Sequence, residues 1–319
     1  MKPLVSIIVP VYRVEDCLIR CLDSLYRQTL RDIEIVLVDD ASPDRCGTIC
    51  DKYAAKDNRF KVVHHVVNKG LSAARNSGIK NAAAAYLMFV DSDDYVHEDF
   101  CRLPYECAVL HGADMVIFRY KRFGYPVKLG FANNELSKFV SFGHKNKWEA
   151  IDIVLNGYPQ AWNKLYKRDL FHNISYPEGY YFEDIGTTHK VVWEASNIYF
   201  KEEILYFKCY RDSSITTLKT EKAMQDWFEM CMLQYQDLVT WGYPSDKLNS
   251  LLYITLLIYC LKRKRDFSDP NYVFCANALR SISNLPQDFS WKKKAMFSLF
   301  KYCPSLFEII CCLWGLKVY

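Results

Sequence analysis

The first 120 residues alternate between short apolar runs and longer stretches in which apolar residues recur every three or four positions. The short runs are rich in Val and Ile, as expected of strands buried on both faces of a parallel sheet. They lie at 4–12, 33–38, 61–65, 86–90 and 114–120. The stretches between them predict helices at 15–28, 42–56, 70–85 and 98–111. Strands and helices that alternate in this way indicate an α/β fold with a mainly parallel mixed sheet flanked by helices.

Ser42 and Pro43 predict where the second of these helices begins. Serine is favoured at the N-cap of a helix, and proline is favoured at the first helical position. We therefore expect this helix to start at Pro43.

Beyond residue 120 the pattern changes twice. Residues 121–147 are irregular, and they are followed by an expected helix at 147–155, a helix opening at 181–184 and paired strands over 197–210. After about residue 217 helical patterns dominate to the end. We predict an α/β domain at 1–217 and a helical C-terminal region at 218–319.

Composition excludes several classes of protein. Half of the 319 residues are apolar and 24% are charged, which indicates a globular rather than a disordered chain, and the net charge of +4 does not indicate nucleic-acid binding. The 13 cysteines include no C-x-x-C pair, which favours reduced cytosolic thiols over a disulfide framework or a zinc site. No run of 18 apolar residues occurs, so we expect a cytoplasmic protein without a conventional transmembrane span.

Acidic residues follow two of the predicted strands where each strand ends. Asp39-Asp40 follow one strand, and Asp91-Ser92-Asp93-Asp94 follow another. Ligands of such sheets bind beyond the carboxyl ends of the strands, so both clusters point to one crevice. Asp91 and Asp93 are costly to hold together without a cation, and their oxygen ligands suit Mg²⁺ or Mn²⁺. The structural alternatives are a solvated turn at 91–94 and a helix N-terminus stabilised by a carboxylate at 39–40.

Gly70 to Asn76 form a glycine turn that enters a helix of small residues. Such a turn can place Arg75 near a phosphate or a ribose. The structural alternative is that the small residues serve only close packing of the helix against the sheet. No G-x-G-x-x-G and no G-x-x-x-x-G-K-[ST] segment is present, so a Rossmann dehydrogenase or a P-loop NTPase would lack its signature. His64 and His65 have no metal-ligand spacing and are expected at the strand surface and in the core.

Four segments together resemble the family 2 glycosyltransferases of the GT-A fold, in the family's order and spacing. They are Val5–Tyr12, Ile35–Ser42, Gly70–Asn76 and Phe89–Asp94. The clear resemblance covers residues 4–120, and weaker family-like segments lie at 162–166, 182–184 and 210–216. Ala41 and Lys69 stand where the family often has glycine, which puts only the local turn geometry in doubt.

The resemblance implies a metal-dependent, inverting transfer from a nucleoside-diphosphate sugar, most often a UDP-sugar. It implies that Pro10 and Tyr12 line the nucleobase pocket and that Asp40 hydrogen-bonds the base. It places Asp91 near the ribose and the donor sugar, and makes Asp93, with Asp91, a ligand of Mn²⁺ or Mg²⁺.

For the acceptor side, the resemblance makes Asp184, or alternatively Glu183, the general base. Trp162 and Lys164 are expected towards the sugar and the acceptor.

Two further arginines are assigned to the donor. Arg211, with Ser213, is expected to reach the diphosphate from a closing loop, and Arg75 is also assigned to the nucleotide-sugar.

The resemblance also implies a cellular role, the synthesis of a surface polysaccharide on a glycan or lipid-linked acceptor. The Q-x-x-R-W signature of processive synthases is missing, which favours transfer of a single sugar. Two alternatives stay open: a sugar-1-phosphate nucleotidyltransferase with a related sheet, and a non-catalytic glycan-binding subunit.

The end of the chain is basic. Residues 247–319 carry eleven Lys and Arg against four Asp and Glu, and the basic clusters flank apolar stretches. This pattern predicts peripheral contact with an anionic membrane surface, at the inner face of the plasma membrane. The alternative is an ordinary helical subdomain with solvated lysines.

Overall fold

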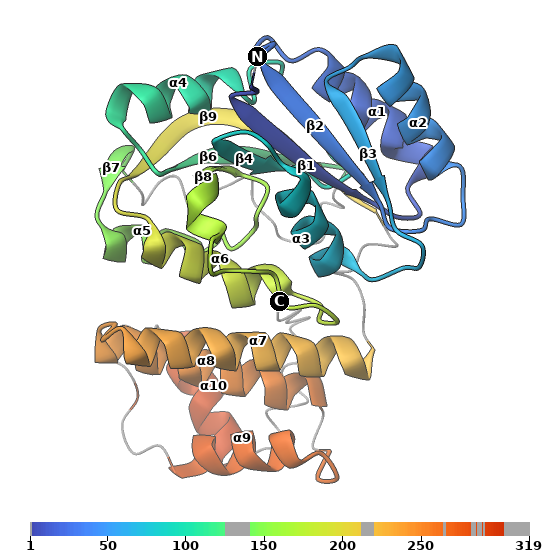
Figure 1. Ribbon diagram of the computed structural model, residues 1–319. Coiled ribbons are helices and arrows are strands. Elements are labelled where there is room, and N and C mark those ends of the chain that lie inside the picture. The colour runs from blue at the N-terminus through green and yellow to red at the C-terminus, as the bar shows by residue number, and fades with distance from the viewer. Residues whose placement is uncertain are drawn as a thin grey trace. The chain divides into compact units, whose positions relative to one another are not determined.

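The computed structural model describes residues 2–124, 141–211, 220–263, 266–281, 285, 289 and 291–302 (Figure 1). The chain divides into two compact units, Met1–Leu218 and Lys219–Tyr319. Ser213 and most of 121–147 lie outside the described residues.

The first unit is built on a mixed sheet whose N-terminal half is parallel. Its strand order is β3-β2-β1-β4-β8-β6-β9-β5, with β7 paired to β9. The parallel half consists of β1 (Val5–Val11), β2 (Ile33–Asp39), β3 (Phe60–His64) and β4 (Tyr86–Phe89). Every residue of β1 and β2 is buried, as their nearly unbroken apolar runs predict.

The other half of the sheet mixes directions. It consists of β5 (Tyr95–Val96), β6 (Met115–Phe123), β7 (Gly143–Lys145), β8 (Lys164–Lys167) and β9 (Ile198–Cys209). The predicted pair of strands over 197–210 is wrong, because β9 is one strand that pairs with β5, β6 and β7. Its polar segment Lys201–Glu203 is not a turn but lies where the register with β6 shifts.

Helices flank this sheet (Figure 1). They are α1 (Glu15–Tyr26), α2 (Cys46–Lys56), α3 (Leu71–Asn81), α4 (Arg102–His111), α5 (Lys147–Leu155) and α6 (Glu183–Glu194), with the short 3-10 helix η3 (Arg168–Phe171). The predicted architecture, a mixed sheet flanked by helices, is confirmed. The predicted start of α2 at Pro43 is wrong, because the Ser42 hydroxyl accepts the Arg13 N–H and donates to Asp44 instead of capping the helix.

Helix α3 packs unusually close to the sheet. A Cβ added at Gly78 would lie 2.2 Å from Cγ2 of Ile8 in β1, so only glycine permits this approach. Arg75 lies one turn earlier on the same helix, and its position is therefore fixed by the contact between α3 and β1.

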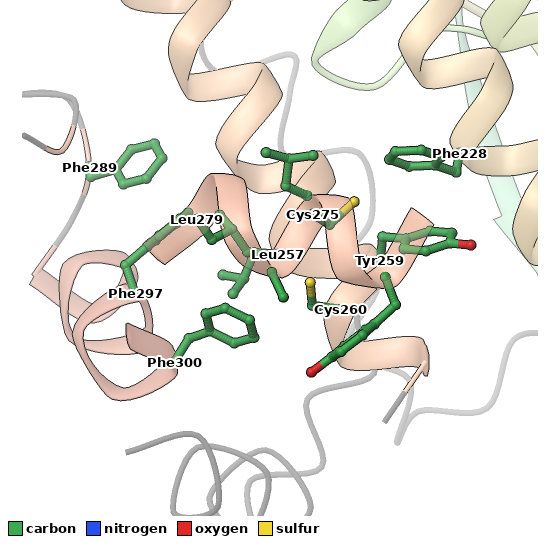
Figure 2. Packing of buried hydrophobic residues seen from close by; sticks show 12 residues of the cluster. Phe228, Leu257, Tyr259, Cys260, Cys275, Leu279, Phe289, Phe297 and Phe300 are labelled. Carbon is green, nitrogen blue, oxygen red and sulfur yellow. The ribbon is translucent and has the colours of Figure 1, made fainter. Parts of the chain in front are cut away.

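The second unit is helical where it is described. It consists of α7 (Glu221–Thr240), α8 (Ser245–Arg263), α9 (Pro270–Ser281) and α10 (Trp291–Tyr302). Its core brings together aromatic, aliphatic and thiol side chains, among them Phe228, Leu257, Tyr259, Cys275 and Phe300 (Figure 2). Among the described residues, no helix is long and apolar enough to cross a membrane.

Candidate active site

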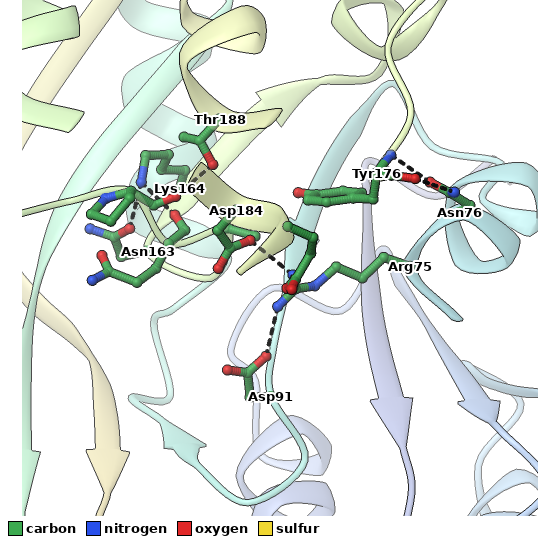
Figure 3. A network of polar contacts seen from close by, with 12 residues as sticks. Arg75, Asn76, Asp91, Asn163, Lys164, Tyr176, Asp184 and Thr188 are labelled. Carbon is green, nitrogen blue, oxygen red and sulfur yellow. Dashed lines mark hydrogen bonds and ion pairs between the residues drawn. The ribbon is translucent and has the colours of Figure 1, made fainter. Parts of the chain in front are cut away.

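Both acidic clusters lie at the carboxyl edge of the parallel strands. Asp40 follows the last residue of β2, and Asp91 lies two residues beyond β4. The start of α6, at Glu183, is joined to the same edge by Arg75 of α3 (Figure 3). The site is therefore assembled from four separate parts of the chain: the ends of β2 and β4, helix α3 and the start of α6.

The segment 91–94 gathers negative charge. Asp91, Asp93 and Asp94 each offer one ligand atom, and these atoms lie within 4.8 Å of one another. Burial raises the pKa of Asp93, and the neighbouring charge of Asp91 raises it further. Such crowding favours a bound cation, which would relieve the repulsion.

Asp94 differs from its two neighbours because both of its oxygens accept hydrogen bonds from β9. The Tyr206 hydroxyl donates to Oδ2 at 2.7 Å, and the Cys209 N–H donates to Oδ1 at 2.7 Å. Tyr206 also accepts the Asp91 N–H at 3.1 Å, so Asp94 fixes the backbone of the acidic turn against β9. Asp91 and Asp93 are thus the residues that fit a divalent cation, whereas Asp94 supports the turn that presents them.

Two arginines hold the backbone and side chain of Asp93. Arg20 donates to the Asp93 carbonyl at 2.7 Å. Nη1 of Arg211 lies 3.5 Å from Oδ2 of Asp93, and Nη2 of Arg211 donates to the Arg13 carbonyl at 3.3 Å. Arg211 therefore lies beside the acidic turn, whereas its predicted partner Ser213 lies outside the described residues.

Arg75 joins this turn to helix α6. Its Nη2 donates to Oδ1 of Asp91 at 3.1 Å, and its Nη1 donates to Glu183 and, at 2.8 Å, to Oδ1 of Asp184 (Figure 3). The guanidinium side chain is only 1% exposed. Arg75 thus faces carboxylates of the protein, which differs from the predicted contact with the donor.

Exposure distinguishes the two adjacent carboxylates of α6. The Glu183 side chain is 6% exposed and that of Asp184 is 19% exposed. Burial raises the pKa of both carboxyls, and the positive charge of Arg75 opposes that rise. Asp184 is therefore better placed than Glu183 to exchange a proton with a substrate.

Asp40 is saturated by the protein. Its Oδ1 accepts the Lys69 N–H at 2.9 Å and lies 2.6 Å from Nδ1 of His65. Its Oδ2 accepts the Gly70 N–H at 2.8 Å and the Asn68 side-chain amide at 2.9 Å. A carboxylate has about four lone-pair positions, so Asp40 has none left for a nucleobase in this arrangement. Its base-binding role stays a prediction that this geometry does not favour.

Tyr12 lies at the end of β1 and is accessible. Tyr12 is 38% exposed as a residue, and the guanidinium carbon of Arg13 lies 5.3 Å from the centroid of its ring. Pro10 is buried within β1. Ala41, where the related enzymes often have glycine, adopts φ 54°, in the left-handed region that favours glycine.

Trp162 and Lys164 are both buried, so an acceptor would not reach them in this arrangement. Trp162 stacks on Tyr206 with ring centroids 4.2 Å apart. The Lys164 ammonium donates to the Tyr158 and Gln160 carbonyls, each at 2.6 Å, and to Oδ1 of Asn163 at 2.7 Å. Burial lowers the pKa of Lys164 to about 7, and Asp184 opposes that shift. The acceptor role of both residues stays a prediction that their burial does not favour.

Sequence reasoning missed several residues that support the site. His65 and Asn68 hold Asp40, Tyr206 holds the acidic turn, and Asn76 pairs with the backbone of Tyr176. Asn76 stands beside Arg75 in the glycine turn, so the motif itself pointed to it. For Tyr206 no local signal exists, because its partners lie more than 100 residues away.

Comparison with known proteins identifies the family of the chain. A model of "Glycosyl transferase family 2" matches residues 6–175. EpsJ of Bacillus subtilis, an uncharacterized glycosyltransferase, is 38% identical over 248 residues, which cover 74% of this chain and 69% of that protein. The glycosyltransferase GlyA of Streptococcus pneumoniae is 33% identical over 76% of this chain, which spans only 36% of GlyA.

Solved structures extend the likeness of the fold. S. aureus TarS 1–349 in complex with UDP-GlcNAc is 20% identical, with a TM-score of 0.71 over 96% of this chain and 88% of that one. The mannosyltransferase PcManGT from Pyrobaculum calidifontis, in complex with GDP-Man and Mn²⁺, has a TM-score of 0.52 at 12% identity over 99% of this chain and 89% of that one. Family model, relatives and fold agree, and the chain belongs to glycosyl transferase family 2, a family of sugar-transferring enzymes.

Proposed function

We propose that this protein transfers one sugar from a UDP-sugar to a hydroxyl group of a glycan or lipid-linked acceptor, with inversion at the anomeric carbon. The observation that carries the proposal is the convergence of Asp91 of the acidic turn and Asp184 of α6 on the single guanidinium of Arg75. It brings a cation-binding turn and a base close to one another, as a direct displacement needs.

On the donor side, Asp91 and Asp93 would hold Mn²⁺ or Mg²⁺. A divalent cation bound there would neutralise charge on the diphosphate leaving group. The protein's own contribution is to present both carboxylates on a turn that Tyr206 and Asp94 hold rigidly. Tyr12 offers an accessible ring on which a nucleobase can stack.

On the acceptor side, Asp184 would accept the proton of the attacking hydroxyl. Alcohols are weak nucleophiles, so a positioned carboxylate must remove this proton as the new bond forms. Asp184 lies in the first turn of α6, and it is more exposed than Glu183.

The donor and the biological role rest on the relatives. A structural neighbour was solved with UDP-GlcNAc, which supports a UDP-sugar. A relative from Bacillus spizizenii, 38% identical over 120 residues, is a poly(ribitol-phosphate) beta-glucosyltransferase, which supports a role in cell-surface polymer synthesis.

The test is release of nucleoside diphosphate from a panel of UDP-, GDP- and dTDP-sugars, with and without Mn²⁺, by wild-type protein and Asp184→Asn. We expect Mn²⁺-dependent release of UDP that the variant largely loses. A nucleotidyltransferase would instead form nucleotide sugar from sugar 1-phosphate and nucleoside triphosphate, with release of pyrophosphate. A glycan-binding subunit would turn over no donor.

We further propose that the helical unit contacts an anionic membrane surface, where a lipid-linked acceptor would reside. Trp291 and Tyr302, at the two ends of α10, are 72% and 74% exposed, and Lys294 is exposed between them. Exposed aromatic rings beside lysines suit the interface of an anionic bilayer. Lys294→Glu combined with Lys301→Glu should reduce co-sedimentation with phosphatidylglycerol vesicles, and equal co-sedimentation of the wild type and this variant would contradict the contact.

A further inference from the structure

The guanidinium of Arg75 is surrounded by acidic side chains of the protein. It contacts Asp91 from the end of β4 and both Glu183 and Asp184 from the start of α6. Its side chain is 1% exposed, and the ring of Tyr176 lies 5.2 Å from the guanidinium carbon. Both terminal nitrogens therefore bind carboxylates, and little of the group faces solvent.

We propose that Arg75 is a positioning residue that holds the base Asp184 at a fixed place relative to the donor-side carboxylate Asp91. The inference rests on the proposed function, because it takes Asp184 as the base. It replaces the expectation that Arg75 binds the donor phosphate or ribose.

The geometry supports a bridge rather than a ligand contact. Nη1 donates to Asp184 at 2.8 Å, while Nη2 donates to Asp91 at 3.1 Å, so one planar group spans the two halves of the site. The rigid planar fork of arginine suits this task better than a lysine ammonium, which offers a single point charge. An arginine that bound a phosphate would need nitrogens directed towards the donor.

Contacts of helix α3 with its neighbours fix the position of Arg75. Asn76 donates to the Tyr176 carbonyl at 2.9 Å and accepts the Tyr176 N–H at 2.9 Å, which ties α3 to the segment before α6. Gly78 packs against Ile8 of β1. The place of Arg75 is thus set by the sheet on one side and by the segment before α6 on the other.

A split between kcat and donor affinity tests the proposal. A positioning residue should lower kcat without weakening the donor, because a misplacement of about 1 Å can cost about 10²-fold in rate. We expect Arg75→Lys to lower kcat about 10²-fold for the UDP-sugar that the panel identifies, while the dissociation constant for UDP with Mn²⁺ changes by less than about threefold. A donor-binding arginine would instead weaken UDP binding at least tenfold, and that result would overturn the proposal.

A double-mutant cycle identifies the residue through which Arg75 acts. If Arg75 works through Asp184, then Arg75→Lys should add little to the loss already caused by Asp184→Asn. Additive losses in the double variant would show that Arg75 acts elsewhere.

A control separates positioning from stability. Arg59 is another largely buried arginine, which pairs with Asp57 at 2.7 Å and donates to the Tyr26 carbonyl at 2.8 Å. Arg59→Lys should lower the thermal midpoint while leaving kcat and UDP affinity unchanged. If Arg75→Lys does not fold, the double variant Arg75→Gln with Glu183→Gln removes one buried charge of each sign, and its kcat and UDP affinity are judged by the same criteria against those of Glu183→Gln alone.

Failure of the inference is distinguishable from failure of the proposed function. Wild-type protein that releases no nucleoside diphosphate from any donor would refute the proposed function. Active wild type with normal kcat in Arg75→Lys would refute only the role of Arg75.

Discussion

The two acidic clusters look alike in the sequence but differ in the structure. Asp39-Asp40 and Asp91–Asp94 both follow buried parallel strands. Asp39 and Asp40 have protein donors, including the Ser42 N–H and two further backbone N–H groups, and a histidine ring beside each. In the other cluster, Asp93 lies among like charges, and its carboxyl has a raised pKa.

The comparison teaches that acidic clusters at the same kind of place in the sequence can differ in how far the protein compensates their charge: the carboxylates of 39–40 are hydrogen-bonded, whereas the pKa of Asp93 stays raised although Arg211 lies 3.5 Å away. Buried carboxylates that are fully hydrogen-bonded are part of the scaffold. Carboxylates held against one another store repulsion that a cation relieves.

Asp93→Ala should abolish divalent-dependent turnover and leave the fold intact. Loss of a metal ligand removes several kcal/mol of transition-state stabilisation, because the leaving diphosphate is no longer neutralised. The measurement is UDP release with added Mn²⁺ and in EDTA. The control is Asp51→Ala, which removes an exposed carboxylate near Asp39-Asp40 and should keep full activity. Near-wild-type rates for Asp93→Ala, or full activity in EDTA, would contradict the cation-binding role that distinguishes Asp91–Asp94 from Asp39-Asp40.

Asp184→Asn should keep UDP binding and lower the turnover rate by about 10²–10⁴-fold, the usual contribution of a positioned base. Glu183→Gln is the matched control and should lose less, because Glu183 is more deeply buried. Steady-state rates and UDP titrations measure both. A dead Glu183→Gln beside a normal Asp184→Asn would move the base to Glu183.

The pH dependence of the rate should reflect the burial of Asp184. Burial raises the pKa of this carboxyl, against the opposing charges of Arg75 and Lys164. Because a base acts only when ionised, activity should fall as the pH drops through this raised pKa, above the ordinary value of about 3.9. A profile of kcat/KM against pH measures the effect, and an acid limb at or below the ordinary value would contradict it.

Asp40→Asn should act mainly on stability. The amide nitrogen of Asn cannot accept the bonds that one Asp40 oxygen receives, and an unsatisfied buried donor costs about 1–3 kcal/mol. Denaturant unfolding measures the loss, and UDP affinity should change less. A stable Asp40→Asn that no longer binds UDP would show that Asp40 contacts the base, and the contrast between the clusters would then fail.

The smallest effect is expected at His64. The hydrogen bond that the Asp39 carboxylate accepts from the His64 ring raises the pKa of His64, and Asp51 adds to the rise. The stability that this pair contributes is therefore present below the ordinary histidine pKa and is lost as the pH rises through the raised value. His64 is nearly half exposed, so solvent screening keeps the effect to about 1 kcal/mol or less. The measurement is the free energy of unfolding of wild type and of His64→Gln at pH 5 and at pH 8. The difference between the two proteins should be smaller at pH 8. An equal or larger difference at pH 8 would contradict a stabilising pair of protonated His64 with Asp39.

The sequence by itself determined the elements and the chemistry available to them. Nearly unbroken apolar runs predicted β1 and β2 because strands buried on both faces carry apolar side chains at most positions. The acidic residues could be placed at strand ends because each lies beside its strand in the chain. The helix predicted near 147–155 lies at Lys147–Leu155, because its periodicity is local; the structure adds a capping box at Asn146.

Only the tertiary structure decided what each charged residue does. Arg75 meets Glu183 and Asp184 across 108 and 109 positions of the chain, and Tyr206 meets Asp91 across 115. Asp40 is saturated because the segment between β3 and α3 brings four donors to it. Local patterns encode burial, but the compensation of a buried charge depends on which distant donors the packed chain brings within hydrogen-bonding distance.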